Sequence, residues 1–233
     1  MELMVVVAIA GILMSLLLPA LSSAKEKSRR SVCNQNERQV IIALQMYAIG
    51  YDQFLPDAAN DQGGYNSMIL SDLTFTNIML NLGDSNCLYC PNLVYANGSM
   101  DGEVPGVGHK IGYSYLAAAQ QQQQSPKGPD TGWQGPMKAT DNKQVLADAN
   151  YWIKTSALAM TLAPHSRSGG VALVSSVSVA GLPISSSPSP GVSSAAAGAV
   201  GGNIGSLDGS VVWKPIRVMN IYPASTDGAM GNW

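Results

Sequence analysis

The feature that most constrains this chain is an uninterrupted apolar run near its N-terminus. Residues 3–21 read LMVVVAIAGILMSLLLPAL, nineteen residues without a charged side chain. At 1.5 Å per residue, a helix of that length spans about 29 Å, which matches the hydrocarbon core of a bilayer. We therefore expect residues 1–24 to form an apolar helix that lies in a membrane at some stage.

The segment from residue 25 to residue 50 continues this helix with a different character. It opens on a charged collar, residues 25–30, that holds Lys25, Lys27, Arg29 and Arg30. Its apolar positions then follow the helical period closely, and Gly50 is the expected end of the helix. The predicted face comprises positions 21, 24, 28, 32, 40, 43, 44 and 47. This amphipathic half should pack against a globular head formed by residues 51–233.

Glu2 and Pro19 argue against two simpler interpretations of the apolar run. A cleaved signal peptide has a basic start and an apolar core of about 7–15 residues, and a plain single-span anchor requires neither of these two residues. A carboxylate at the end of an apolar helix is costly to bury unless it is paired, so in a bundle of such helices Glu2 would fix their register. Pro19 removes a backbone hydrogen bond and should kink or locally melt the helix near residues 15–19.

These residues resemble a known family. The run ELMVVVAIAGIL at residues 2–13, with Gly11 inside it and Pro19 seventeen residues after Glu2, is similar to the N-terminal helix of type IV pilins and type II secretion pseudopilins. The resemblance implies an inner-membrane precursor, with a basic leader and the first mature residues upstream of Met1, that a prepilin peptidase trims and methylates. It further implies a helical homopolymer, built by an assembly machinery, in which the apolar helices form the core and Glu2 pairs with the N-terminal amine of a neighbour.

Other residues resemble the branch of this family that has an H-X9-DG C-terminal region. They are Ser28 to Gln39, Met46 to Ala48, Cys90-Pro91, Tyr113 to Tyr115 and Leu146 to Asp148. The motif itself is broken here, since His165 is not followed after nine residues by Asp-Gly, which instead occurs at Asp208-Gly209. The intervening residues, about 181–202, are rich in Ser, Ala, Gly and Pro, and we expect an exposed flexible loop there.

The head shows strand signals and no catalytic motif. Residues 171–179, 203–213 and 144–147 are strand-like and are punctuated by Gly-Gly and Asp-Gly. Residues 51–108 read as loop-rich. We expect an α+β fold in which a long N-terminal helix carries a small antiparallel sheet and a loop-rich head.

Acidic residues dominate one part of the head. Seven Asp and Glu residues and no Lys or Arg lie between residues 39 and 109, which indicates a solvated acidic face. Asp57, Asn60 and Asp61 are weaker calcium candidates, because they offer oxygen ligands in a glycine-containing loop without EF-hand spacing. We also expect the collar of one subunit, through Lys25 and Arg29, to meet the acidic face of another.

The three cysteines, Cys33, Cys87 and Cys90, allow several arrangements. For an exported protein a disulfide is favoured, with Cys33–Cys90 as the first choice and Cys87–Cys90 as the second. Cys87 and Cys90 could also form half of a zinc site whose other half would come from Cys33, His109 or His165, at no recognisable spacing. Asp148, His165 and Asp208 form a third, weaker metal candidate, and no cofactor is assigned from the sequence.

Composition narrows the classes of function. A net charge of −2 excludes nucleic-acid binding through a generally basic surface. The chain lacks HExxH, GxSxG and P-loop motifs, so we expect no enzyme. The first expectation is a subunit of an extracellular type IV pilus-like filament whose head serves adhesion. The alternatives are a periplasmic secretion pseudopilin and a monomeric membrane-anchored binding domain.

Overall fold

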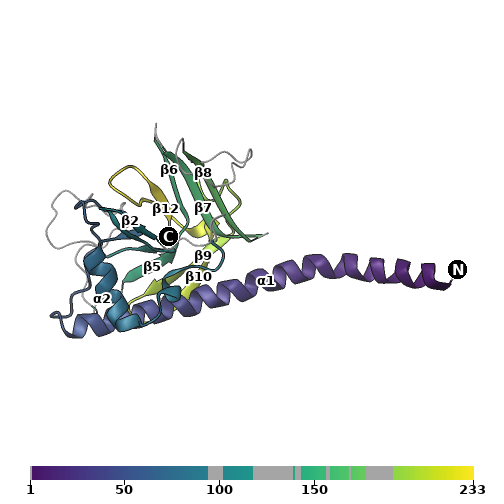
Figure 1. The fold of residues 1–233 in the computed structure, drawn as a ribbon, viewed down its shortest axis with the longest axis horizontal. Coiled ribbons are helices and arrows are strands. Elements are labelled where there is room, and N and C mark those ends of the chain that lie inside the picture. The colour runs from purple at the N-terminus through teal and green to yellow at the C-terminus, as the bar shows by residue number, and fades with distance from the viewer. Residues whose placement is uncertain are drawn as a thin grey trace.

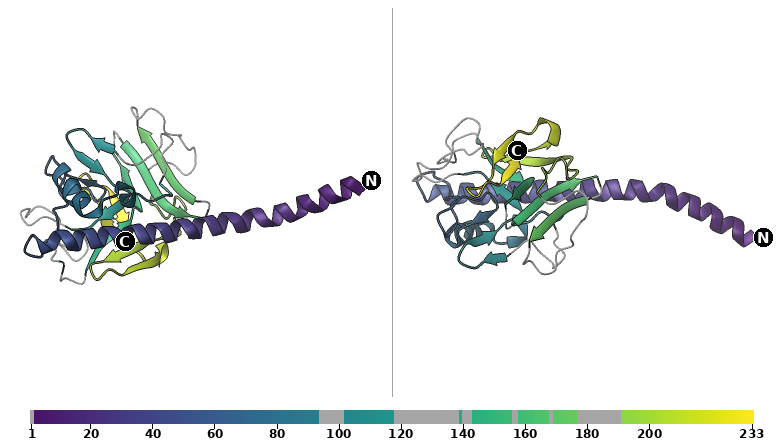
Figure 2. Two further views of the ribbon diagram at one scale, coloured as in Figure 1. Left: turned by 60° about the horizontal axis from the view of Figure 1, so that its bottom comes forward. Right: turned by 90° about the horizontal axis from the view of Figure 1, so that it is seen from above.

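The protein consists of one long N-terminal helix and a sheet-rich head that covers the C-terminal half of that helix (Figure 1). The computed structural model describes residues 2–93, 102–117, 139, 143–155, 158–167, 169–176 and 191–233. Helix α1 spans Glu2–Ile49, and the N-terminal half projects away from the head in every view (Figures 1 and 2). The α+β fold with a helical stem is therefore confirmed, and so is the expected end of the helix next to Gly50.

Pro19 does not interrupt α1. The predicted kink or local melting near residues 15–19 is wrong, because these residues all remain helical and the helix bends only gradually (Figure 2). The Ser15 hydroxyl donates a hydrogen bond to the carbonyl of Ile12 at 2.8 Å. A proline inside a helix removes one backbone hydrogen bond, and its ring clashes with the carbonyl group one turn earlier. Here a smooth bend of α1 accommodates the ring.

The face of α1 that contacts the head differs in part from the predicted one. Positions 40, 43 and 44 are buried as expected, but positions 24, 28 and 32 are exposed. The buried stripe instead runs through Glu26, Cys33, Glu37, Ile41, Leu44 and Ala48. These residues follow the helical period, one or two positions away from the predicted stripe in the collar region. Hydrophobic periodicity predicted the wrong face in this region because the helix buries polar side chains, Glu26 and Glu37, against the head.

The strands of the head form three antiparallel sheets. A three-stranded sheet has the order β1-β3-β2, a four-stranded sheet the order β10-β9-β5-β4, and a five-stranded sheet the order β11-β12-β6-β7-β8. The strands are β1 (Ile69–Leu70), β2 (Gly102–Val104), β3 (Gly108–Lys110), β4 (Tyr113–Tyr115), β5 (Gln144–Asp148), β6 (Tyr151–Lys154), β7 (Leu158–Ser166), β8 (Gly169–Ser176), β9 (Gly201–Ser206), β10 (Val211–Pro215), β11 (Ile221–Pro223) and β12 (Met230–Asn232). Two short 3-10 helices are also present: η1 (Ser85–Leu88) precedes β2, and η2 (Ile216–Val218) lies between β10 and β11.

The four-stranded sheet packs along α1. Strands β9, β5 and β10 pack on the helix, and the predicted strands at 144–147 and 203–213 correspond to β5 and to the β9–β10 hairpin. Side chains from α1, from this sheet and from β7 of the five-stranded sheet form one core. Its largest fully buried members include Ile41, Leu44, Tyr113, Tyr115, Leu146 and Leu162. Residues 171–176 of the predicted strand 171–179 lie in β8, and residues 177–179 lie outside the described part of the chain.

Residues 51–108 contain more regular structure than the predicted loop. Helix α2 (Asp72–Leu82) begins after Ser71, whose hydroxyl accepts a hydrogen bond from the Thr74 backbone N–H at 3.1 Å, and ends at Gly83 in a left-handed conformation, φ 78°. These are standard start and stop signals of a helix. The helix packs beside α1.

The Ser/Ala/Gly/Pro-rich insert is packed in the part that the structure describes. Ser194 is fully buried and its hydroxyl donates to the carbonyl of Leu162 at 2.8 Å. Ala197 and Ala199 lie against Ala163 and Leu173. The prediction of an exposed flexible loop is therefore wrong for residues 191–202, and residues 181–190 lie outside the described part of the chain.

Candidate functional site: a buried cysteine, histidine and aspartate cluster

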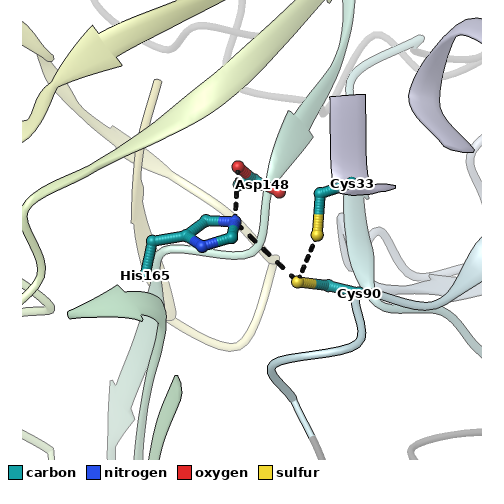
Figure 3. A group of neighbouring side chains, drawn as sticks. All are labelled: Cys33, Cys90, Asp148 and His165. Carbon is teal, nitrogen blue, oxygen red and sulfur yellow. Dashed lines mark hydrogen bonds and ion pairs between the residues drawn. The ribbon is translucent and has the colours of Figure 1, made fainter. Parts of the chain in front are cut away.

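Four side chains with metal-binding or redox chemistry meet between α1 and the head. Cys33 comes from α1, Cys90 from the loop after η1, Asp148 from the end of β5 and His165 from the end of β7. Their ligand atoms all lie within 4.8 Å of one another, and the four residues are 0%, 2%, 1% and 0% exposed. In Figure 3 the four side chains point toward a common centre.

The contacts inside the cluster are close. The Sγ atoms of Cys33 and Cys90 are 2.6 Å apart, and both residues are free thiols. Cys90 Sγ lies 3.9 Å from Nε2 of His165, and the same nitrogen lies 3.2 Å from Oδ2 of Asp148. The two cysteines predicted to form a disulfide, Cys33 and Cys90, thus lie together, although no covalent bond joins them in this structure.

Backbone packing places Cys90 in the cluster. Gly112, just before β4, donates its N–H to the carbonyl of Leu88 at 2.8 Å. A Cβ atom at this glycine would lie 2.7 Å from the backbone nitrogen of Cys90, so only glycine allows the two segments to approach this closely.

A second layer of polar residues surrounds His165. The Oε1 atom of Glu26 lies 2.8 Å from Nδ1 of His165 and accepts a hydrogen bond from Nε of Arg30 at 3.0 Å. Its Oε2 atom accepts from Nδ2 of Asn92 at 2.7 Å. Trp213 covers the group, with its ring edge-on to the imidazole and the Arg30 guanidinium over its face at 4.2 Å. Glu26 is therefore a buried carboxylate whose two oxygens both have partners.

The electrostatics of the cluster follow from these contacts. Burial opposes the charge on His165, but hydrogen bonds to Asp148 and Cys90 outweigh it and raise the pKa of His165 to about 11. Burial raises the pKa of the Cys33 thiol. Burial also acts to raise the pKa of Cys90, yet the hydrogen bonds from Cys33 and His165 lower it. The two thiols are therefore inequivalent, and Cys90 is the one more readily deprotonated.

Glu37 is a second buried carboxylate of α1, one turn beyond Cys33. It is fully buried, and neither of its oxygens has a hydrogen-bond partner among the described residues. Burial is the main cause that raises the pKa of Glu37 well above the usual range of a carboxyl group, and the neighbouring carboxylate of Asp148 raises it further. Burial consequently favours the neutral form of this side chain in the folded chain.

Several predicted candidates lie away from the cluster. The thiol of Cys87 donates to Oε1 of Gln39 at 2.9 Å, so the alternative Cys87–Cys90 pairing and the Cys87–Cys90 half of a zinc site do not form here. His109 stacks on Phe75 and faces Asp72. Asp208 and Gly209 lie in the exposed turn between β9 and β10, where Asp208 accepts from the Ser210 N–H at 2.8 Å. Of the trio Asp148, His165 and Asp208, only the first two meet.

The calcium candidates bond to their own loop. Oδ1 of Asp57 accepts from the Ala59 N–H, and Oδ1 of Asn60 accepts from the N–H groups of Gln62 and Gly64. Asp61 accepts from the N–H of Asp72 at the start of α2. These oxygens therefore serve turns and a helix start.

The residues predicted for subunit assembly have varied surroundings. Lys25 is exposed, but Arg29 is half-buried and its Nη1 donates to Oδ1 of Asn92 at 2.9 Å. No atom would lie within 4 Å of a Cβ at Gly11. The Glu2 side chain lies outside the described part of the structure. Of the predicted assembly residues, Arg29 thus has a hydrogen-bond partner within its own chain.

Sequence reasoning missed Glu26, Glu37 and Asn92. The two glutamates lie at helical spacing with Cys33, Ile41 and Leu44, and this spacing is the signal that could have revealed them. Nothing near Asn92 in the sequence marks it.

Comparison with known proteins found no matching family model, no similar curated protein and no similar solved structure. Helix α1 is long and apolar enough to cross a membrane, by its length and composition, as a membrane anchor or a signal sequence is.

Proposed function

We propose that this chain is a structural subunit of a pilin-like filament, which enters the membrane by its apolar segment, residues 3–21, and then polymerises through it. The observation that carries the proposal is the exposure of that segment: its described large apolar side chains are 53–78% exposed in the single chain. An apolar surface of this extent needs lipid or protein to cover it.

Membrane insertion explains the length of the apolar segment but not the presence of Glu2. Polymerisation through the segment explains both. A carboxylate at the apolar end of a helix favours the one packing arrangement that brings a cation to it. In the proposed polymer that cation is the N-terminal amine of a neighbouring subunit, and the head lies outside for adhesion. The proposed role is structural and not enzymatic.

The collar adds an electrostatic contact to this proposal. Lys25 and Lys27 are exposed on α1 just beyond the apolar segment, and the acidic face of a second copy is their proposed partner. Filament assembly should then weaken with added salt and with Lys25→Glu. Assembly that is insensitive to both would exclude this contact without excluding the filament.

Electron microscopy of material sheared from cells tests the main proposal. We expect filaments that contain this chain in the wild type and a marked loss of filaments in Glu2→Ala, with the amount of membrane-inserted subunit unchanged. A membrane protein that never forms filaments, or a Glu2→Ala variant that behaves as wild type, would favour the monomeric anchor. Filaments that stay in the periplasm would identify a secretion pseudopilus instead of a surface pilus.

A further inference from the structure

We propose that Cys33, Cys90, Asp148 and His165 form a buried, four-coordinate site for a divalent transition-metal ion of the zinc class, which fixes the head to α1. The inference rests on the cluster alone and is independent of the proposed filament.

The ligand set fits such an ion. Two thiols, one imidazole and one carboxylate are donors that zinc uses, and four protein ligands without an open position are typical of structural zinc sites. The four residues come from α1, the loop after η1, β5 and β7, so one ion would connect the helix to three separate segments of the head. The cluster is also the only group of three or more such ligands found among the described residues.

The spacing is close to that of a tetrahedral site. Ligand atoms at 2.0–2.3 Å from one zinc ion lie about 3.3–3.8 Å from one another. The distances from His165 Nε2 to Asp148 Oδ2, 3.2 Å, and to Cys90 Sγ, 3.9 Å, are near this range. The two sulfurs, at 2.6 Å, must separate by about 1 Å.

The same pair of sulfurs is also near a disulfide, whose bond is about 2.05 Å long. A disulfide would involve Cys33 and Cys90 alone and would not explain why Asp148 and His165 lie beside them. The arrangement of His165 and Asp148 (Figure 3) is therefore the observation that favours the metal.

The surroundings of His165 are those of a metal ligand. Histidines that bind metals usually donate their second ring N–H to a carboxylate, which fixes the tautomer and the ring orientation. Here Nε2 faces Asp148 and Cys90, and Nδ1 faces the carboxylate of Glu26 at 2.8 Å. Glu26 is held in turn by Arg30 and Asn92.

Asp148 supplies a second, independent observation. Its Oδ2 atom accepts from the Asn203 backbone N–H and contacts His165, whereas its Oδ1 atom is buried without a hydrogen-bond partner among the described residues. A buried carboxylate oxygen without a partner is costly, and a cation bound to the same carboxylate group would offset that cost.

Metal analysis of the full-length protein in detergent tests the proposal. The protein is purified under reducing conditions, loaded with Zn²⁺ or Co²⁺, and freed of unbound ion. We expect one zinc ion per chain by mass spectrometry. We also expect a Co²⁺ form with a thiolate-to-metal charge-transfer band. The matched control is Cys87→Ala, which removes a cysteine outside the cluster and should keep both signals.

Variants of the ligands give the second readout. Cys90→Ser and His165→Ala should weaken Zn²⁺ affinity, measured by competition with a chromophoric chelator. The loss should exceed the 10–100-fold, roughly, that is typical when a residue hydrogen-bonded to a ligand, such as Glu26, is removed. Circular dichroism identifies which variants remain folded, and Asp148→Asn is the conservative alternative if the others unfold. A folded, reduced wild type that binds no zinc would overturn the proposal. So would a Cys33–Cys90 disulfide in the protein isolated from cells without reductant.

Discussion

Oε1 of Glu26 lies 2.8 Å from Nδ1 of His165, and this contact joins two residues that are 139 positions apart in the sequence. Glu26 is on the helix, just beyond the apolar segment, and His165 is on β7. Both side chains are buried. The contact therefore links α1, just beyond its apolar segment, directly to the five-stranded sheet.

Glu26→Ala should destabilise the head strongly. The substitution leaves His165 and the Asn92 amide buried without their acceptor, and removal of one partner from a buried ion pair costs about 3–5 kcal/mol. Denaturant unfolding of the protein in detergent, followed by the fluorescence of its tryptophans, measures the change. Glu103→Ala, at an exposed position, is the control and should change the unfolding free energy by less than about 0.5 kcal/mol. Equal effects of both substitutions would contradict this role of Glu26.

Glu37→Met should have the opposite effect. Both oxygens of Glu37 are buried without hydrogen-bond partners among the described residues, and replacement by an apolar side chain of similar length removes a cost of about 1–3 kcal/mol. Burial raises the pKa of Glu37, so its neutral form is favoured in the folded chain. The part of its unfavourable effect that comes from ionisation is absent below the ordinary carboxyl range and grows as the pH rises above it.

Unfolding measured at several pH values tests this prediction. The gain in unfolding free energy from Glu37→Met should be larger at neutral pH than at pH values near the ordinary carboxyl range. A loss of stability at neutral pH would show that Glu37 has a partner that compensates for its burial.

The sequence predicted the helix and several strands, but not the content of the site. The apolar segment and the Asp208-Gly209 turn carry strong local signals, namely a long charge-free run and a hairpin turn. The closeness of Cys33 to Cys90 was also expected. Glu26 and Glu37 were not predicted to be buried, because hydrophobic periodicity identifies apolar faces and is blind to polar side chains that find partners in the head. Asn92 is placed by contacts between segments distant in sequence, for which one sequence carries no signal.

Helix α2 is a different case, since its signals are local. Ser71 precedes an eleven-residue segment, DLTFTNIMLNL, and Gly83 follows it. A serine start and a glycine end predict a helix, but the surrounding Asn, Asp and Gly residues favoured a loop. The prediction of an exposed insert erred similarly: small residues at 194–199 allow close packing as readily as flexibility.

Gly170→Ala should disturb the site from outside it. A Cβ atom at Gly170 would lie 1.8 Å from the backbone oxygen of Asn92, so either β8 or the Asn92 loop must move. Asn92 holds both Arg29 and Glu26, and displacement of its loop would break these hydrogen bonds. We expect a loss of about 1–3 kcal/mol in unfolding free energy.

The control is Gly102→Ala, where no atom lies within 4 Å of the added methyl group and a change below about 0.5 kcal/mol is expected. Hydrogen exchange should show faster exchange around Asn92 in Gly170→Ala alone. Wild-type stability and exchange in that variant would contradict the close approach.

Paired truncations on the exposed apolar surface separate polymerisation from membrane anchoring. Leu13 and Leu17 are 57% and 65% exposed on α1 and lie four residues apart on one side of the helix. In Leu13→Ala/Leu17→Ala the segment keeps no charge and remains apolar enough to insert. Each substitution nevertheless removes about 2 kcal/mol of burial free energy that packing between subunits would gain. We expect filament yield in sheared material to fall while the amount of membrane-inserted protein stays constant.

The matched control, Leu73→Ala/Leu80→Ala, removes the same atoms from α2 on the head, where the two leucines are 71% and 79% exposed, and should leave filaments intact. If filament yield is unchanged by the first pair, the side of α1 that carries Leu13 and Leu17 does not form the polymer core.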